Sequence, residues 1–424
     1  MQSLMQSPMQ SPMKSSVQAQ VQSPVQAPVQ SPVQAPVQSP VQAPVQSSTQ
    51  VPVQAPPEAP TPSSAQRFWT PTLARLTPYI PGEQSRIEGL VKLNTNENPY
   101  PPSEAALEAM RSAIGPAMRL YPDPAATTLK SSIARLYRIS AEQVFVGNGS
   151  DEVLAFIFQA LLSREGGCAF PEISYSFYPV FCQLYGIEAL SFPLDADFRV
   201  PLERVAAGAS SLIVPNPNAP TGLALPADAF AAFARSRPST LVVVDEAYVD
   251  FGAESCVRLL DQFDHLMVVQ TLSKSRALAG LRVGFALGPP ALIEALERVK
   301  NSFNSYTLDR IAIEGAVAAI EDHAWFEQNR ARVMASRARL HNALGDCGMQ
   351  VLPSQANFLF ARHPRIAGAE LAAGLRERRI LVRHFAKPGI QDFLRITVGT
   401  EEQCAALLAA LTGILRELPE RSPV

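Results

Sequence analysis

Cysteine and histidine are scarce in this sequence of 424 residues. It has five of each, and they are scattered along the chain without a C-x-x-C pair or a metal-ligand spacing. An odd number of isolated cysteines is typical of a reducing compartment rather than of a disulfide framework. We therefore expect neither disulfides nor a metal site.

Strong net charge and long apolar runs are also missing. The net charge is -2, which argues against a nucleic-acid partner or an anionic membrane surface. No apolar run is long enough to cross a bilayer, and the N-terminus lacks the pattern of a secretory signal. We expect a cytoplasmic protein that binds small anions through individual arginines and backbone amides.

Proline is abundant, and many of the 38 prolines lie in an N-terminal repeat. Up to about Pro62 the chain repeats Met-Gln-Ser-Pro and then Val-Gln-Ser-Pro-Val-Gln-Ala-Pro. Such a segment favours polyproline II and has no apolar face to bury. The sequence predicts a disordered, low-complexity tail over residues 1–66. A ligand for a proline-recognising partner is the alternative, but the regular spacing favours repeat expansion.

Apolar runs and helical patterns alternate in the middle of the chain. Strand-like runs lie at 144–146, 167–170, 188–192, 211–214, 241–244, 266–269 and 283–287. Helices are predicted at 104–114, 127–137 and 226–236, and also directly after Glu152. Unbroken apolar strands separated by helices indicate a mainly parallel sheet covered on both faces, which binds ligands beyond the carboxyl ends of its strands.

The C-terminal part is helical from about 291 to 344, and a second, smaller α/β region follows it. The predicted organisation is an N-terminal arm at 67–120 that packs with the small domain, a large domain at 121–310 and a small domain at 311–424. The fold class is α/β, with helices on both faces of the large sheet.

Lys274 lies just past the apolar run at 266–269, among small and hydroxyl residues. A lysine amine forms a Schiff base with a carbonyl compound when a partly dry site keeps some of it neutral. Pyridoxal phosphate is the usual partner. A lone Ser-Lys pair would more often belong to a solvated loop. The assignment of Lys274 as a Schiff-base lysine therefore depends on residues elsewhere in the chain.

Two strand ends offer further candidates. Ser150 and Asp151 follow a glycine loop and begin a helix, an arrangement that binds anions but equally fits an ordinary helix cap. Asp245 closes an apolar strand, where it could keep a pyridine nitrogen protonated. Tyr248 could donate to the hydroxyl of such a ring. Each could also be a plain loop residue.

Ser273 and Arg282 flank Lys274 and could bind phosphate. Tyr175 could stack on a flat ring, although a core tyrosine is the commoner role. Arg395 interrupts an apolar strand, and arginine is seldom buried unpaired. It therefore either pairs with a structural carboxylate or binds a substrate anion.

Seven motifs in register resemble the histidinol-phosphate aminotransferases, which belong to the aspartate-aminotransferase-like, fold type I pyridoxal-phosphate enzymes. The resemblance runs from about Phe68 to the C-terminus. The motifs are the asparagine-rich arm before Pro99, Tyr121–Pro124, Gly147–Glu152, Asn216–Gly222, Asp245–Tyr248, Ser273–Ser275 with Gly280–Arg282, and Leu394–Thr397.

The resemblance implies roles for these residues. Lys274 would form the Schiff base with pyridoxal 5'-phosphate, Asp245 would meet the ring nitrogen and Tyr248 the ring hydroxyl, and Tyr175 would stack on the ring. The phosphate would be surrounded by Ser150, Asp151, Ser273 and Arg282, and by Tyr121 from a second subunit. Arg395 would hold the carboxylate of glutamate or the phosphate of histidinol phosphate, with Arg383 as a second anion contact. A complete site then requires a homodimer.

One position departs from the family pattern. The family usually has asparagine immediately before Pro-Thr-Gly, where it supports the ring hydroxyl, and this sequence has Ala219. Asn218 could take over that role, or Tyr248 could act alone. A neutral hydrogen bond is worth roughly 0.5–1.5 kcal/mol, so its loss would retune the cofactor without abolishing catalysis.

The expected activity is transamination of L-histidinol phosphate with 2-oxoglutarate in histidine biosynthesis, as a ping-pong cycle through Lys274. An aromatic amino-acid aminotransferase and a threonine-phosphate decarboxylase are the near alternatives. A non-catalytic scaffold that only binds the cofactor is a remote one, because Lys274, Asp245 and Arg395 are all present.

Overall fold

The computed structural model describes residues 64–85, 87–162 and 165–417. The tail predicted at 1–66 lies outside these residues except at its end. There the structure differs from the prediction, because residues 64–66 begin a short 3-10 helix, Ser64–Phe68. A short helix α1, Pro71–Arg75, follows it.

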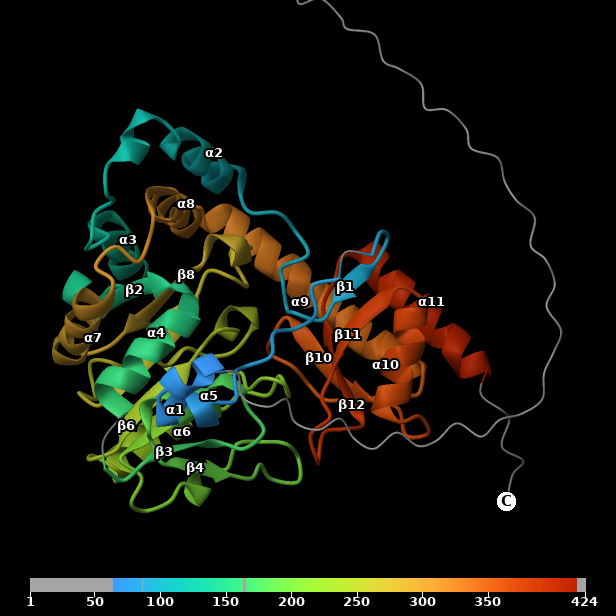
Figure 1. Ribbon diagram of the computed structural model, residues 1–424. Coiled ribbons are helices and arrows are strands. Elements are labelled where there is room, and N and C mark those ends of the chain that lie inside the picture. The colour runs from blue at the N-terminus through green and yellow to red at the C-terminus, as the bar shows by residue number, and fades with distance from the viewer. Residues whose placement is uncertain (1–63, 86, 163–164, 418–424) are drawn as a thin grey trace, which may run out of the picture. The chain divides into compact units, whose positions relative to one another are not determined.

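A seven-stranded sheet forms the larger part of the described chain (Figure 1), in the order β2-β8-β7-β6-β5-β3-β4. The strands are β2 Val144–Asn148, β3 Cys168–Pro171, β4 Ala189–Phe192, β5 Ser211–Pro215, β6 Leu241–Asp245, β7 Leu266–Thr271 and β8 Val283–Leu287. Only β8 runs antiparallel to its neighbours, β2 and β7. The predicted mainly parallel sheet is confirmed.

Alternate residues of the central strands pack into two separate cores. In β6, Val242 and Val244 belong to one core, and Leu241 and Val243 belong to the other. Successive side chains of a strand point to opposite faces, so continuous apolar runs are what a sheet covered on both sides needs.

Helices cover both faces of this sheet. One face carries α3 Thr127–Tyr137, α6 Ala227–Ser236 and α8 Arg310–Glu321, and the other carries α4 Gly149–Ile157, α5 Phe177–Tyr185 and α7 Pro290–Phe303. The sequence analysis did not identify α5. It has only nine residues and begins directly after a polar loop, so the sequence shows no long apolar period that would predict a helix.

A five-stranded sheet forms the C-terminal part, in the order β1-β11-β12-β10-β9. The strands are β1 Val91–Leu93, β9 Gln350–Val351, β10 Phe358–Arg362, β11 Ile380–His384 and β12 Phe393–Thr397. Its core also contains leucines of α10 Gly368–Glu377 and α11 Glu401–Glu417. Among the described residues, no helix has both the length and the apolar character to span a membrane.

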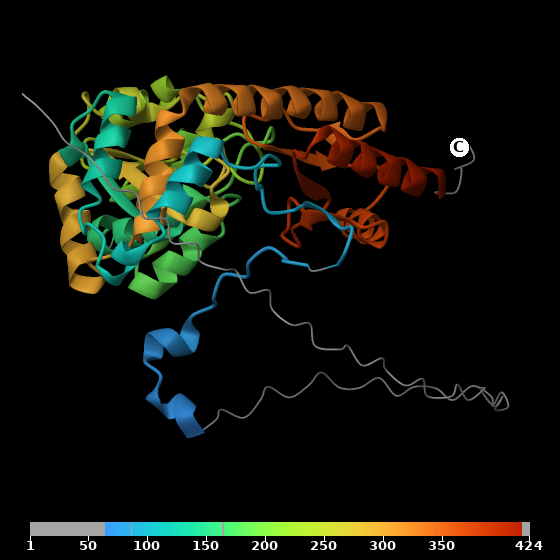
Figure 2. The same cartoon turned by 90° about the horizontal axis from the view of Figure 1, so that it is seen from above.

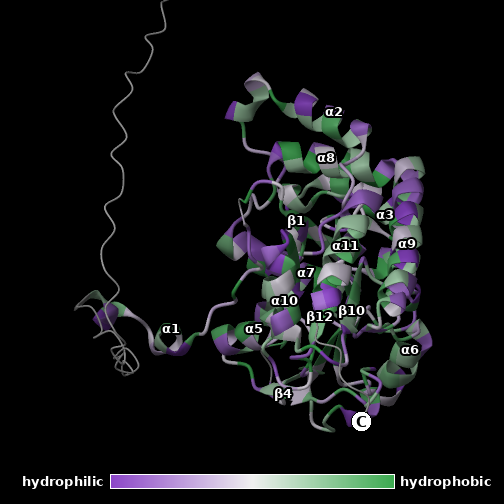
Figure 3. Ribbon diagram, turned by 90° about the vertical axis from the view of Figure 1, so that its right-hand side faces the viewer, coloured by the Kyte–Doolittle hydropathy of each residue, from purple (hydrophilic) through white to green (hydrophobic). Residues whose placement is uncertain are grey.

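The long helix α9, His323–Asp346, extends from the side of the large sheet to the side of the small one (Figure 2). It buries a single stripe, Asn329, Val333, Ser336, Leu340 and Leu344. This three-to-four-residue spacing leaves a broad polar face, which shows as hydrophilic colour along α9 in Figure 3.

Packing divides the chain differently from the predicted boundaries. Helix α8, predicted to belong to the small domain at 311–424, buries Ile313, Ala316 and Ile320 in a core of the large sheet. Helix α2, Glu104–Ala113, lies in the predicted arm but packs along α8 (Figure 1), so only β1 of that arm joins the small sheet. A helical period shows which face of a helix is buried but not which sheet it covers.

Candidate active site

A pocket of about 480 Å³ opens where β5, β6 and β7 end and α4 begins. It brings together most of the candidate residues, although they are far apart in the sequence. Those that line it are Ser150, Asp151, Tyr175, Asp245, Tyr248, Ser273, Lys274, Arg282, Arg383 and Arg395. Their clustering agrees with the rule that parallel sheets bind ligands beyond the carboxyl ends of their strands.

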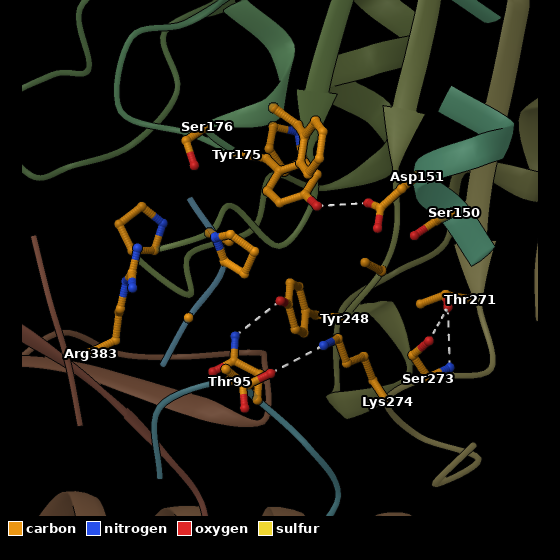
Figure 4. Close-up of a pocket in the computed structure, with 18 of the residues that line it drawn as sticks. Thr95, Ser150, Asp151, Tyr175, Ser176, Tyr248, Thr271, Ser273, Lys274 and Arg383 are labelled. Carbon is orange, nitrogen blue, oxygen red and sulfur yellow. Dashed lines mark hydrogen bonds between the residues drawn. The ribbon is translucent and has the colours of Figure 1, made fainter. Parts of the chain in front are cut away.

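Lys274 extends into this pocket from the loop after β7 (Figure 4). Its Nζ donates to the Thr95 carbonyl at 3.4 Å and lies 5.7 Å from the centre of the Tyr248 ring. The Asn98 side chain donates to the Lys274 carbonyl at 2.9 Å and so fixes the backbone. The amine has no carboxylate partner among the residues that the structure describes, which leaves it available to a carbonyl ligand.

Asp245 is the buried carboxylate of the pocket, with 4% of its surface exposed. Its Oδ2 accepts from the Tyr178 hydroxyl at 2.8 Å, and its Oδ1 accepts from the Ala247 amide at 3.2 Å. Burial raises the pKa of Asp245 to about 6, and the two hydrogen bonds act in the opposite direction. A positive group in the pocket would stabilise the ionised form.

The neighbouring Glu246 is also buried but points away from the pocket. It accepts from the Ser255 hydroxyl at 2.7 Å, the Cys256 amide at 2.6 Å and the Gln270 amide at 2.8 Å. Burial nevertheless raises its pKa from 4.5 to about 7. Ionising Glu246 therefore costs more free energy in the folded protein than in the unfolded chain.

We expect the free energy of unfolding of the cofactor-free protein to fall as the pH rises from about 4.5 to 7. Unfolded Glu246 loses its proton near pH 4.5 and folded Glu246 near pH 7. At about 1.4 kcal/mol for each pKa unit, the difference amounts to about 3 kcal/mol. Denaturant unfolding at several pH values should show this slope and a flatter one in Glu246→Gln. The exposed Glu370→Gln serves as control, and an unchanged slope in Glu246→Gln would contradict the assignment.

A candidate anion site lies where α4 begins. Gly149 has φ +83°, and a Cβ there would lie 2.5 Å from the Arg282 guanidinium. A Cβ on Gly284 would lie 2.3 Å from the Ser150 nitrogen. These glycines therefore let Arg282 and the first turn of α4 approach each other. Because backbone amides and the helix dipole favour negative charge at such an end, a phosphate fits beside Ser150 and Arg282.

Two further contacts border this anion site. The Thr271 hydroxyl donates to the Ser273 hydroxyl at 2.9 Å. The Tyr175 hydroxyl donates to Asp151 at 2.7 Å (Figure 4), and burial raises the pKa of Tyr175 well above its usual value. Arg282 reaches the other oxygen of Asp151 only at 3.4 Å. Since that contact is long, the guanidinium retains donors for a phosphate.

Arg395 and Arg383 lie directly opposite each other on the antiparallel strands β12 and β11. The Arg395 guanidinium donates to the Asn94 carbonyl at 2.9 Å, and its buried Nε has no partner. Burial, and also Arg383, lower the pKa of Arg395. Within the described part of the chain no carboxylate forms an ion pair with either arginine. Like charges placed opposite each other are unfavourable, so the pair calls for an anionic ligand.

Two predicted site residues are not part of this pocket. The Asn218 side chain is buried behind the wall, where it donates to the Ile173 carbonyl at 3.0 Å and to Thr221 at 3.2 Å. Ala219 lines the pocket instead, so Asn218 does not replace the missing asparagine. Tyr121 is 78% exposed and stacks on Tyr306 with ring centroids 4.6 Å apart. That Tyr121 contacts the cofactor phosphate of a partner subunit stays a prediction.

Two N-terminal loops contribute pocket residues for which the sequence predicted no role. Within the arm, Thr95 and Asn96 line the pocket from the loop after β1, and Tyr79 and Pro81 line it from the segment before β1. These loops have neither apolar periodicity nor a catalytic spacing. The asparagine-rich run before Pro99 is one of the seven motifs, but no role is predicted for Thr95 or Asn96 within it.

The arrangement fits a ligand with three parts. A lysine amine faces the space, a buried carboxylate with only neutral donors lies at one end, and a helix start with an arginine and hydroxyls lies at the other. An aldehyde on a ring that carries a protonated nitrogen and a phosphate matches these groups one by one. Pyridoxal phosphate, which the family resemblance implies, has this chemistry.

Fold and pocket thus define a class of enzyme that acts on amino groups, and comparison with known proteins agrees. The family model for class I and II aminotransferases matches residues 88–411. The chain belongs to this family.

Its curated relatives narrow the class. The chain is 60% identical over 352 residues to histidinol-phosphate aminotransferase 1 of Bradyrhizobium diazoefficiens, which is 83% of this chain and 99% of the relative. It is 58% identical over 349 residues to histidinol-phosphate aminotransferase 2 of Rhizobium meliloti, which is 82% of this chain and 99% of the relative.

Solved structures share the fold. A histidinol-phosphate aminotransferase from Sinorhizobium meliloti in complex with pyridoxal-5'-phosphate superposes with a TM-score of 0.76 and 25% identity, over 84% of this chain and 100% of that one. A mutant aspartate aminotransferase from Thermus thermophilus has a TM-score of 0.71 over 83% of this chain and 100% of that one. The predicted aspartate-aminotransferase-like fold is confirmed.

Proposed function

We propose that this protein transfers the amino group of L-histidinol phosphate to 2-oxoglutarate, with pyridoxal 5'-phosphate as cofactor, in histidine biosynthesis. The observation that carries the proposal is one pocket that holds a buried carboxylate together with a lysine amine and two arginines that form no ion pair within the described chain. The curated relatives at 58–60% identity support the choice of substrate.

The residues of the pocket would hold the cofactor at three places. Lys274 would attach it through its amine, and Asp245 would meet the ring nitrogen. Ser150, Ser273 and Arg282 would hold the phosphate. Tyr248 would meet the ring hydroxyl and Tyr175 would pack on the ring face.

When bound, pyridoxal phosphate withdraws electrons from the substrate carbon that carries the amino group. Once the amino group of the substrate has displaced Lys274 from the cofactor, the freed Lys274 amine would be the base that takes the proton from that carbon and passes it to the cofactor. In the return half-reaction it would supply the proton to the corresponding carbon of the acceptor. Asp245 would hold the positive charge of the ring nitrogen, which in turn would keep the carboxyl ionised.

Arg383 and Arg395 would bind the anionic end of each substrate. The donor ends in a phosphate and the acceptor in a carboxylate, so one pair of guanidinium groups serves both half-reactions. Bidentate hydrogen bonds from arginine suit either group.

We further propose a cytoplasmic homodimer in which Tyr121 reaches the pocket of the partner subunit. Large apolar side chains are exposed in the same two segments: Ile114 at 65% and Leu120 at 51% precede Tyr121, and Phe303 at 78% precedes its stacking partner Tyr306. Exposed apolar residues in such a group are typical of a protein interface.

A single-turnover experiment tests the function. The protein is loaded with pyridoxal phosphate and mixed with L-histidinol phosphate, and the absorbance of the aldehyde form should convert rapidly to that of the amine form. Adding 2-oxoglutarate should reverse the change. Conversion by phenylalanine but not by histidinol phosphate would contradict the substrate, and release of carbon dioxide would point to a decarboxylase.

A further inference from the structure

Asn96 lies in the arm between β1 and α2 and is 1% exposed. Its backbone has φ 57°, a left-handed conformation that asparagine adopts more readily than most residues. Its carbonyl accepts from the Asn357 side chain at 2.9 Å. The residue is therefore fixed in place before any ligand binds.

The hydrogen bonds to Thr397 determine which way the Asn96 amide points. The Thr397 hydroxyl accepts from the Asn96 backbone N–H at 3.0 Å and donates to Asn96 Oδ1 at 3.1 Å. No other acceptor for this hydroxyl is found in the described part of the chain. The oxygen of the amide therefore faces Thr397, and its NH₂ group faces Tyr248.

The Asn96 NH₂ group donates to the Tyr248 hydroxyl oxygen at 3.0 Å. A phenol has a single proton, and this contact uses the oxygen as an acceptor. The Tyr248 proton must point elsewhere. None of the described residues accepts it, and the Tyr248 side chain lines the pocket, so the pocket is the open direction. Ala219, which also lines the pocket, contributes only a methyl group.

We propose that Asn96 is a positioning residue that directs the Tyr248 proton into the pocket, toward a phenolic oxygen on the ring of the cofactor. The proposal rests on the proposed function, in which Tyr248 meets that oxygen. Ala219 cannot donate a hydrogen bond to the ring oxygen. In this proposal Asn96 of the arm, oriented by Thr397, secures the hydrogen bond that Tyr248 donates to that oxygen.

The test uses Asn96→Asp, which preserves the shape of the side chain but can no longer donate to Tyr248 once ionised. Tyr248 would then turn its proton toward the new carboxylate. We expect pyridoxal phosphate to bind the cofactor-free full chain about 3- to 10-fold more weakly in equilibrium dialysis, as for the loss of one neutral hydrogen bond. The absorbance of the bound cofactor should also change its pH dependence.

The same substitution in a Tyr248→Phe background distinguishes an effect on the direction of the Tyr248 proton from a general effect on the structure of the pocket. If Asn96 acts through the hydroxyl, Asn96→Asp weakens binding by a factor at least about 3-fold smaller there than in the unchanged background. Equal factors in both backgrounds, or no weakening in either, would overturn the proposal. If the unchanged chain does not retain pyridoxal phosphate, the proposed function fails first, and this assignment fails with it.

Thermal unfolding of the cofactor-free variants shows whether each one folds. If Asn96→Asp does not, Thr397→Val provides the test. It removes the hydroxyl that orients the amide and keeps the shape of a strand residue. The Thr397→Val substitution should again weaken binding by a larger factor when Tyr248 is present than in the Tyr248→Phe background, and equal factors in the two backgrounds would overturn the proposal.

Discussion

Lys274→Ala is expected to lower the rate of amino transfer by at least about 10⁴-fold, the upper range for the loss of a positioned proton-transfer group. The Lys274 amine is the only lysine amine that lines the pocket formed by the described residues. Thr95 and Asn98 fix its position, and no second lysine of the described chain lines the pocket to replace it. The variant should remain folded, because the side chain forms no ion pair within the described chain and loses only a 3.4 Å hydrogen bond.

Reduction with borohydride provides a second measurement for the same variant. Reduction should trap pyridoxal phosphate on the peptide that contains Lys274 in the unchanged protein, and no peptide should carry it in Lys274→Ala. Lys387→Ala is the matched control, since that exposed lysine donates to the Glu172 carbonyl and does not line the pocket. A rate above about one hundredth of the unchanged value would contradict the role of Lys274 as the base.

The principal site residues could be predicted because they follow from strand ends. Asp245 and Lys274 each come directly after a buried run, and parallel strands bring their carboxyl ends to one edge of the sheet. A lysine and an aspartate at such strand ends also suggest few reactions, because the amine can form a Schiff base and the carboxylate can hold a positive charge. The large sheet and the position of the pocket were therefore accessible from local patterns alone.

Contacts that depend on tertiary packing could not be predicted. Arg383 and Arg395 face each other only because β11 and β12 pair in one register. Asn96 and Tyr248 are 152 positions apart and meet through the placement of the arm. The helix α8 has the same apolar period whichever sheet it covers. The strand register, the placement of the arm and the sheet that α8 covers depend on packing of the whole core, and local sequence patterns do not determine them.

Asn218 shows the same limit at a single residue. It lies next to the position where the family usually has asparagine, and its side chain is of the right type. The backbone nevertheless directs it to the Ile173 carbonyl and Thr221, away from the pocket. A shift of one residue in a loop moves the side chain to the other side of the wall.

Asp245→Asn is expected to slow amino transfer by about 10²- to 10³-fold, in the range for removing one preorganised electrostatic group. Asparagine has the same shape, can still accept from the Ala247 amide through its oxygen and can donate through its NH₂ group to the Tyr178 hydroxyl oxygen. It cannot balance a protonated ring nitrogen. Stability should change in the opposite direction. Burial raises the pKa of Asp245 from 3.8 to about 6, so at pH 8 the cofactor-free protein holds an ionised carboxylate without a cationic partner in hydrogen-bonding contact.

A neutral amide removes that buried charge, and the cofactor-free Asp245→Asn variant should unfold at the same or higher denaturant concentration than the unchanged protein at pH 8. At pH 4.5 the advantage should shrink, because Asp245 is then protonated. Slow transfer together with equal or greater stability would show that the carboxylate is retained for catalysis rather than for folding. A loss of stability at pH 8 would instead make Asp245 a structural residue, and the assignment to the ring nitrogen would fall.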